Sequence, residues 1–183
     1  MLKKKKQRIY AFIDSQNLNV STQKFGWKMD WRKFRKFLKD KYGVTRAYLF
    51  IGYVPEMMEM YEFLHGLGYG VVLKPTLEMH RIPKDASIKL EGEDKKPVKG
   101  NVDADMVLWT MKEMPNYDKA VIVTGDGDFF TLIEYLKEQG RLHKLLTPNV
   151  HYSSLFKPFQ KNIEQLGKYH RQLSYKSRKP TPK

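Results

Sequence analysis

Short apolar runs alternate with segments of helical spacing along most of this chain. Apolar runs bounded by turn residues predict strands at 8–14, 44–54, 69–74, 119–124 and 141–146. Apolar residues that recur every three or four positions predict helices at 30–41, 55–66, 102–114, 128–139 and 153–167. Because strands and helices alternate, the pattern favours right-handed crossovers. It predicts an α/β fold with a central, mostly parallel sheet of about five strands.

Several helix ends are marked by single residues. Asp30 has the short acceptor side chain that caps a helix N-terminus, and Gly43 follows the same predicted helix. Pro55 opens the next helix, which ends near Gly66 or Gly68. Pro158 lies within the segment 153–167, where we expect it to break the helix.

Three segments fall outside the alternating pattern. Residues 1–7 read as a basic arm, and residues 76–99 form a polar, proline- and glycine-punctuated stretch that predicts an exposed hairpin or flap. Residues 168–183 carry basic residues and no acid, which predicts a basic, flexible tail. The expected domain therefore covers residues 8–167, with the flap inserted.

Length and charge narrow the possible functions. The 183 residues suit one domain, and 34 Lys and Arg against 20 Asp and Glu give a net charge of +14. Such a surface favours nucleic acid as a partner, with an anionic membrane surface as the main competitor. The chain has no cysteine, which excludes disulfides and thiolate metal sites. It also lacks a run long enough for an export signal or a membrane span, so we expect a cytoplasmic protein.

Carboxylates stand at the ends of two predicted strands. Asp14 follows an apolar run, and Asp126 and Asp128 follow another, separated by Gly127. The carboxyl ends of parallel strands meet at one edge of a sheet, which is where open α/β folds usually bind ligands. Each acid also has an alternative, purely structural interpretation. In that interpretation Asp14 or Asp126 forms a turn, and Asp128 caps the helix that follows.

Another acid lies on the apolar side of a predicted helix. Asp103 precedes Met106, Val107, Thr110, Met111 and Met114 at helical spacing, so its side chain should face the sheet. Asp105 is about 200 degrees further round the helix and should face elsewhere, which makes it a secondary candidate.

Crowded carboxylates repel one another unless a cation neutralises them. The natural ion for oxygen ligands is Mg²⁺ or Mn²⁺, and the expected metal ligands are Asp14, Asp103, Asp126 and Asp128. Such an ion would activate water for attack on a phosphodiester. The five histidines show no metal-ligand spacing, and the glycine-rich signatures of nucleotide-triphosphate and dinucleotide binding are missing from the sequence. We therefore expect no small-molecule cofactor.

Three motifs together resemble the NYN domain family, a branch of the PIN-like nucleases. They are Ile13-Asp14-Ser15-Gln16-Asn17, Lys99-Gly100-Asn101-Val102-Asp103 and Thr124-Gly125-Asp126-Gly127-Asp128-Phe129. The resemblance implies a three-layer α/β/α fold and a ribonuclease pocket that depends on magnesium or manganese. It also implies that Asp14, Asn17, Asp103, Asp126 and Asp128 are catalytic. Trp109 stands where the family often has a further acid.

Basic residues near these motifs are expected to contact RNA, either single-stranded or structured. They are Arg81, Lys84, Lys89, Lys95, Lys96, Lys99, Arg171 and Lys176. Aromatic residues of the C-terminal part, Tyr152, Phe156, Phe159, Tyr169 and Tyr175, are candidates for base stacking, although Phe156 and Phe159 fit a core role better.

The leading hypothesis is a metal-dependent ribonuclease that hydrolyses RNA with activated water. The alternative is a noncatalytic RNA-binding adaptor with the same fold, which Trp109 supports. A phosphatase with an aspartyl nucleophile is a weaker third hypothesis, because Asp14-Ser15-Gln16 lacks a second acid two residues on. The sequence leaves the oligomeric state open, a dimer included.

Overall fold

The computed structural model describes residues 7–74 and 102–176. Its centre is a six-stranded sheet of order β3-β2-β1-β4-β5-β6, in which every paired neighbour is parallel. The expected α/β architecture is confirmed, with six strands instead of about five. The strands are β1 (Ile9–Asp14), β2 (Val44–Gly52), β3 (Tyr69–Lys74), β4 (Lys119–Val123), β5 (Leu142–Thr147) and β6 (Ile163–Gln165).

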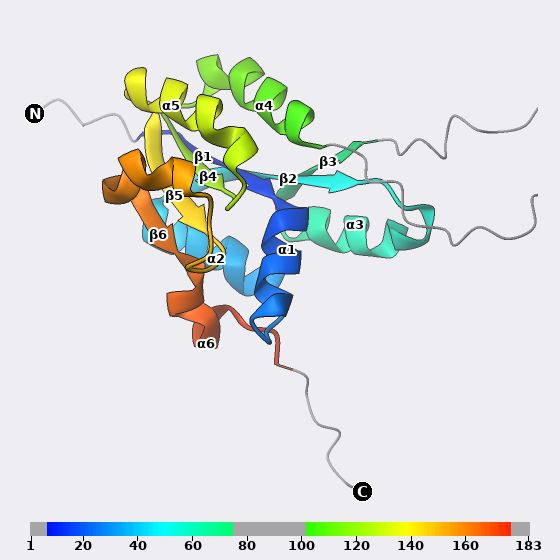
Figure 1. Cartoon of the computed structure of the whole chain (residues 1–183). Coiled ribbons are helices and arrows are strands. Elements are labelled where there is room, and N and C mark those ends of the chain that lie inside the picture. Colours follow the sequence, from blue (N-terminus) through cyan, green and yellow to red (C-terminus); the bar gives the residue numbers. More distant parts are fainter. Residues whose placement is uncertain (1–6, 75–101, 177–183) are drawn as a thin grey trace, which may run out of the picture.

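Helices cover both faces of the sheet (Figure 1). One layer holds α1 (Ser15–Lys24), α2 (Trp31–Tyr42), α3 (Met58–Gly66) and the short α6 (His170–Leu173). The opposite layer holds α4 (Asp103–Lys112), α5 (Phe130–Glu138) and the 3₁₀ segment η5 (Ser154–Asn162). Shorter 3₁₀ turns are η1 (Pro55–Met57), η3 (Met114–Asn116), η4 (Gly127–Phe129) and η6 (Leu166–Tyr169).

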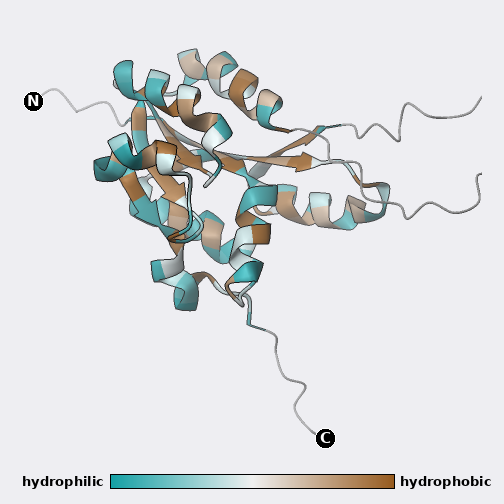
Figure 2. Ribbon diagram, in the orientation of Figure 1, coloured by the Kyte–Doolittle hydropathy of each residue, from teal (hydrophilic) through white to brown (hydrophobic). Residues whose placement is uncertain are grey.

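The central strand divides its side chains between two cores. Ile9, Ala11 and Ile13 pack with the α1–α2–α3 layer, whereas Tyr10 and Phe12 pack with the α4–α5 layer. This alternation follows from the two-residue period of a strand. All six residues of β1 are buried. Hydrophobic residues accordingly concentrate in the strands, and hydrophilic residues lie on the outer helices and loops (Figure 2).

Two elements were not predicted by the hydrophobic pattern of the sequence. Helix α1 has few apolar residues, and its buried positions are Ser15, Leu18 and Thr22, so it shows no apolar stripe. Strand β6 interrupts the helix expected at 153–167. Pro158 lacks the N–H that an α-helix needs, the segment before β6 is 3₁₀, and residues 163–165 pair with the edge of β5.

The chain stays ordered beyond the boundary expected at residue 167. Leu173 has 0% exposure and belongs to the core, its carbonyl accepts from the N–H of Asp30 at 2.8 Å, and Ser174 bridges to Met29. Part of the segment expected to be a tail therefore packs onto the domain through Leu173. The expected flap at 76–99, most of the basic arm, and residues 177–183 lie outside the described residues.

Candidate active site at the topological switch point

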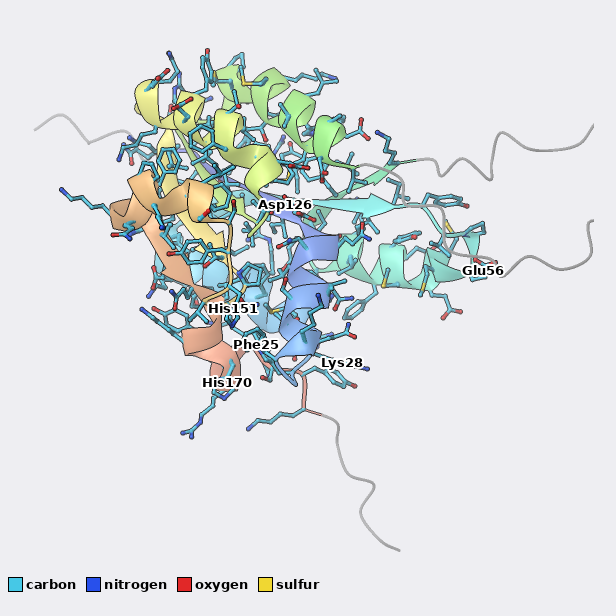
Figure 3. The ribbon with its side chains drawn as sticks, in the orientation of Figure 1. Phe25, Lys28, Glu56, Asp126, His151 and His170 are labelled. Carbon is cyan, nitrogen blue, oxygen red and sulfur yellow. The ribbon has the colours of Figure 1, made fainter. Side chains whose placement is uncertain are left out.

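The order of the strands creates a crevice beside β1. The chain moves from β1 outward to β2 and β3, and then returns to place β4, β5 and β6 on the other side of β1. The connections that leave β1 and β4 therefore run in opposite directions from the carboxyl edge, which is where such folds bind ligands. Asp14 ends β1, and Thr124-Gly125-Asp126 follows β4. Asp126 lies beside the end of β1 and the start of α1 (Figure 3).

Asp14 is buried and held at both oxygens. Only 4% of the residue is exposed. Its Oδ1 accepts from the backbone N–H of Asn17 at 3.0 Å, which caps α1, and its Oδ2 accepts from the hydroxyl of Thr124 at 3.0 Å. Two donors from two different strand ends therefore fix the orientation of this carboxylate.

The charges of two other carboxylates act on Asp14 at this edge. Burial raises the pKa of Asp14 to about 6, the hydrogen bonds from Asn17 and Thr124 oppose that rise, and the charges of Asp103 and Asp126 add to it. Since the repulsion comes from residues on β4's loop and on α4, distant parts of the sequence meet here. The charges of Asp103 and Asp126 therefore reach Asp14, and that these acids share a metal ion stays a prediction.

The loop after β4 is tied to the first turn of α1 by a hydrogen bond, and a second hydrogen bond lies within the loop. The amide oxygen of Asn17 accepts from the N–H of Gly125 at 2.9 Å, and the hydroxyl oxygen of Thr124 accepts from the N–H of Asp126 at 3.1 Å. Asn17 therefore positions the backbone that carries Asp126. The sequence pattern does not single out Thr124, although a threonine directly after an apolar strand and before Asp126 is the signal that could have found it.

Asp126 and Asp128 have different surroundings. Asp126 accepts from the N–H of Asp128 at 3.1 Å and caps η4, whereas Asp128 is exposed. The cap expected of Asp128 on the following helix is not formed, because Asp126 caps η4 and α5 begins after Phe129 without a side-chain cap. A Cβ on Gly127 would lie 3.1 Å from Cβ of Ser153 and 3.2 Å from Cδ1 of Leu155, so this turn has no room for a side chain.

Helix α4 presents its two acids to different neighbours. Met106 and Thr110 are buried on the side that faces the sheet, and the half-buried Asp103 acts on Asp14 from that side. Asp105 instead forms an ion pair with Lys74 at 3.1 Å. The two acids therefore act on different groups, which agrees with the angular separation of the helix period.

Oxygen donors make this edge chemically suited to Mg²⁺ or Mn²⁺. A cation would relieve the repulsion that Asp103 and Asp126 exert on buried Asp14. Among residues 7–74 and 102–176, no three His, Asp or Glu side chains are grouped closely enough to hold one ion. The arrangement therefore fits an ion bound by one or two carboxylates, with water completing its coordination, which is common for Mg²⁺.

The expected RNA contacts divide into described and undescribed residues. Arg171 and Lys176 are exposed, whereas Arg81, Lys84, Lys89, Lys95, Lys96 and Lys99 lie outside the described residues. Phe156 and Phe159 are core residues, as their spacing predicts, and Tyr152 stacks on Phe156. Tyr169 donates to Glu164, while Tyr175 is 62% exposed.

Trp109 packs at the position where the resemblance described above leads one to expect an acid. Its ring lies 6.2 Å from that of Tyr48 and 5.0 Å from the ammonium of Lys112. Its Nε1 is buried without a hydrogen-bond acceptor among the described residues. Trp109 therefore contributes packing and a cation–π contact, and no oxygen ligand.

None of the helices in the described part of the chain has the length and apolar character of a membrane span.

Comparison with known proteins gives three findings. The chain is 28% identical over 134 residues to the low amplitude and bright protein LabA of Synechococcus elongatus, covering 71% of this chain and 68% of that protein. A crystal structure of a protein of unknown function from Vibrio parahaemolyticus matches with a TM-score of 0.68 at 20% identity, covering 96% of this chain and 100% of the other, which shows a shared fold. The NYN domain model matches residues 8–165, and the chain therefore belongs to the NYN domain family, whose fold is PIN-like.

Proposed function

We propose that this NYN domain is a ribonuclease that uses Mg²⁺ or Mn²⁺ to hydrolyse RNA phosphodiester bonds. One observation carries the proposal: a buried carboxylate, Asp14, lies at the topological switch point, where burial and, to a smaller extent, the charges of Asp103 and Asp126 raise its pKa. A titratable group with a perturbed pKa at a ligand-binding edge is typical of a catalytic site. Membership of a family of PIN-like proteins supports the same reaction class.

One or two of the carboxylates of Asp14, Asp103 and Asp126 would hold the ion, with water completing its coordination and exposed Asp128 at the rim of the pocket. The bound ion would polarise the phosphate and lower the pKa of an attacking water. Asn17 and Thr124 keep Asp14 oriented, and they hold the Asp126 loop against it. These hydrogen bonds are formed before the substrate arrives, so no reorganisation of the pocket is needed during the reaction.

Two helix N-termini reinforce the site. Helices α1 and α4 begin at Ser15 and Asp103, next to the acids themselves. The positive ends of their dipoles favour negative charge, both on the carboxylates and on a substrate phosphate. The net charge of +14 would hold the rest of the RNA strand, including through the lysines proposed for the 76–99 segment.

A cleavage assay tests the proposal. Asp126→Asn is expected to lower Mn²⁺-dependent cleavage of a labelled RNA by at least about 100-fold, because even the outer partners of metal ligands contribute about 10- to 100-fold. The matched control is Asp118→Asn, which changes an acid that pairs with Arg8 at 3.1 Å near the opposite ends of the strands. Equal cleavage by the wild type and the Asp126 variant would contradict the proposal.

The second candidate is an RNA-binding adaptor without catalysis. Trp109 supports it, because that side chain supplies no ligand where the family often has an acid. The same assay separates the two functions. Salt-sensitive RNA binding by pure wild-type protein, with no product in Mn²⁺ or Mg²⁺, would favour the adaptor.

A further inference from the structure

Helix α2 is strongly amphipathic, and its polar side is basic. Its buried residues, Phe34, Phe37, Leu38 and Tyr42, pack into the core beneath the sheet. Its other positions include Arg32, Lys33, Arg35, Lys36, Lys39 and Lys41, with Asp40 as the acid. Because the apolar side is already covered by protein, the basic side is what α2 presents to solvent.

Four of these cations form a stripe. Arg32, Arg35, Lys36 and Lys39 are spaced by three, four and seven residues, so they lie along one side of the helix. Together with Leu67 they line a shallow cleft of about 350 Å³. No acid lines this cleft, so its positive charge would attract a chain of negative charges.

The stripe is only weakly neutralised by the protein. Lys36 pairs with Asp40, but both side chains are largely exposed, and exposed pairs of this kind are weak. Within the part of the chain that the structure describes, no salt bridge joins Arg32 or Lys39 to an acid. Arg35 donates to the carbonyls of Gly68 at 3.1 Å and Thr45 at 3.2 Å, which fixes its guanidinium in place.

Aromatic side chains continue the surface at the Arg32 end. A second cleft of about 510 Å³ is lined by Met29, Asp30, Trp31, Arg32, Phe63 and Tyr175. Phe63 is 48% exposed and Tyr175 is 62% exposed. The guanidinium carbon of Arg32 lies 5.9 Å from the centre of the Phe63 ring. Since Arg32 lines both clefts, the aromatic and basic parts form one surface, here called the α2 face.

The α2 face is separate from the acidic pocket. Arg35 contacts Thr45, at the beginning of β2, so the stripe lies toward the amino edge of the sheet. Asp14 lies at the end of β1, on the carboxyl edge. A ligand that occupies the α2 face therefore does not compete for the pocket.

We propose that the α2 face binds single-stranded RNA, with phosphates along the stripe and a base against Phe63 or Tyr175. Basic grooves beside exposed aromatic rings are how proteins hold single strands. An anionic membrane is the poorer occupant, because the main apolar side of α2 is buried against the core, so the helix has no continuous apolar stripe to lay into a bilayer. The proposal rests on the proposed function in taking RNA as the substrate.

A binding experiment without metal tests the α2 face independently of cleavage. The affinity of the full chain for a fluorescein-labelled single-stranded RNA is measured by anisotropy in EDTA over a series of salt concentrations. The test variant combines Arg32→Gln, Lys36→Gln and Lys39→Gln. The control combines Lys137→Gln, Lys157→Gln and Lys161→Gln, which removes the same charge from exposed positions of the opposite layer. Circular dichroism checks that both variants are folded.

We expect the α2 variant to bind RNA at least about tenfold more weakly. The slope of the logarithm of its binding constant against the logarithm of salt concentration should become less steep by up to about 2, since each phosphate contact to a single strand contributes about 0.7. The control should change much less. Phe63→Leu, which keeps an apolar side chain, should weaken binding at low and high salt alike, because stacking is lost and charge is not.

Equal losses in the α2 variant and the control would overturn the proposal, since they would show an effect of net charge alone. Unchanged RNA affinity with lost binding to phosphatidylserine vesicles would also overturn it in favour of a membrane. If Asp126→Asn abolishes cleavage while the α2 variant binds RNA normally, the proposed function survives and this proposal fails. If the wild type never cleaves but the α2 variant loses affinity, the α2 proposal stands alone.

Discussion

The hydroxyl of Thr124 donates to Oδ2 of Asp14 at 3.0 Å, and this hydrogen bond joins the ends of β4 and β1. The same oxygen of Thr124 accepts from the N–H of Asp126 at 3.1 Å. One threonine thereby orients the buried carboxylate and fixes the loop that carries its neighbour. Thr124 therefore links the position of Asp14 to that of Asp126.

Replacing Thr124 with Val should raise the pKa of Asp14 further. The hydrogen bond from Thr124 favours the charged carboxylate and opposes the effect of burial, so its loss favours the protonated form. The acid limb of the cleavage–pH profile should therefore move to higher pH. Thr110→Val is the matched control, because Thr110 is equally buried but donates to the carbonyl of Met106 within α4. An unshifted limb in the Thr124 variant would refute this role.

Asp14→Asn should stabilise the metal-free protein near neutral pH. The pKa of Asp14 is raised from 3.8 to about 6 in the folded state, so folding favours the protonated carboxyl and stability falls as the pH rises through this window. Removing the charge should raise the free energy of unfolding by up to about 3 kcal/mol at pH 7. Urea unfolding in EDTA measures this. The difference from wild type should shrink as the pH approaches 4, and a difference that grows on acidification would have the wrong sign.

Gly127→Ala should disturb the turn between Asp126 and Asp128. The added Cβ would lie 3.1 Å from Cβ of Ser153 and 3.2 Å from Cδ1 of Leu155, closer than normal contacts. We expect a destabilisation of about 1–3 kcal/mol from overpacking, with lower cleavage because Asp126 is displaced. Gly52→Ala is the control, since a Cβ added at Gly52 would have nothing within 4 Å. Thermal unfolding and cleavage, measured on both variants, decide the outcome.

Glu164→Gln should destabilise the junction of α2 and the C-terminal segment. Burial acts to raise the pKa of Glu164, but hydrogen bonds from Tyr169, Tyr42 and Lys41 outweigh it and lower the pKa to about 2. This stability is present above pH 4.5 and is lost as the pH falls toward 2. Near pH 7 we expect a loss of about 1–3 kcal/mol in urea unfolding. Glu56→Gln, at an exposed position of η1, should have no effect, and equal losses in both would contradict the network.

The positions of Asp14 and Asp126 at the carboxyl edge of the sheet could be predicted from the sequence. Asp14 and Asp126 each follow an uninterrupted apolar run, so the rule that parallel strands share a carboxyl edge brings them together. The helical period separates Asp103 from Asp105, and the ion pair of Asp105 with Lys74 agrees with that separation.

Other features depend on tertiary contacts that no local pattern contains. Helix α1 buries Leu18 with two polar residues, so its helical state rests on the cap by Asp14 and on packing. Strand β6 is three residues long and forms because β5 offers an edge. The α2 face likewise needs Phe63 and Tyr175, which are far from Arg32 in sequence and adjacent to it only in the fold.

Calorimetric titration with MnCl₂ tests the central claim most directly. The account predicts saturable Mn²⁺ binding by the wild type and by Asp118→Asn, and loss of that binding in Asp14→Asn, because buried Asp14 is the carboxylate whose charge the ion would stabilise. Undiminished Mn²⁺ binding by a folded Asp14→Asn protein, or no binding by the wild type in the presence or absence of RNA, would contradict it.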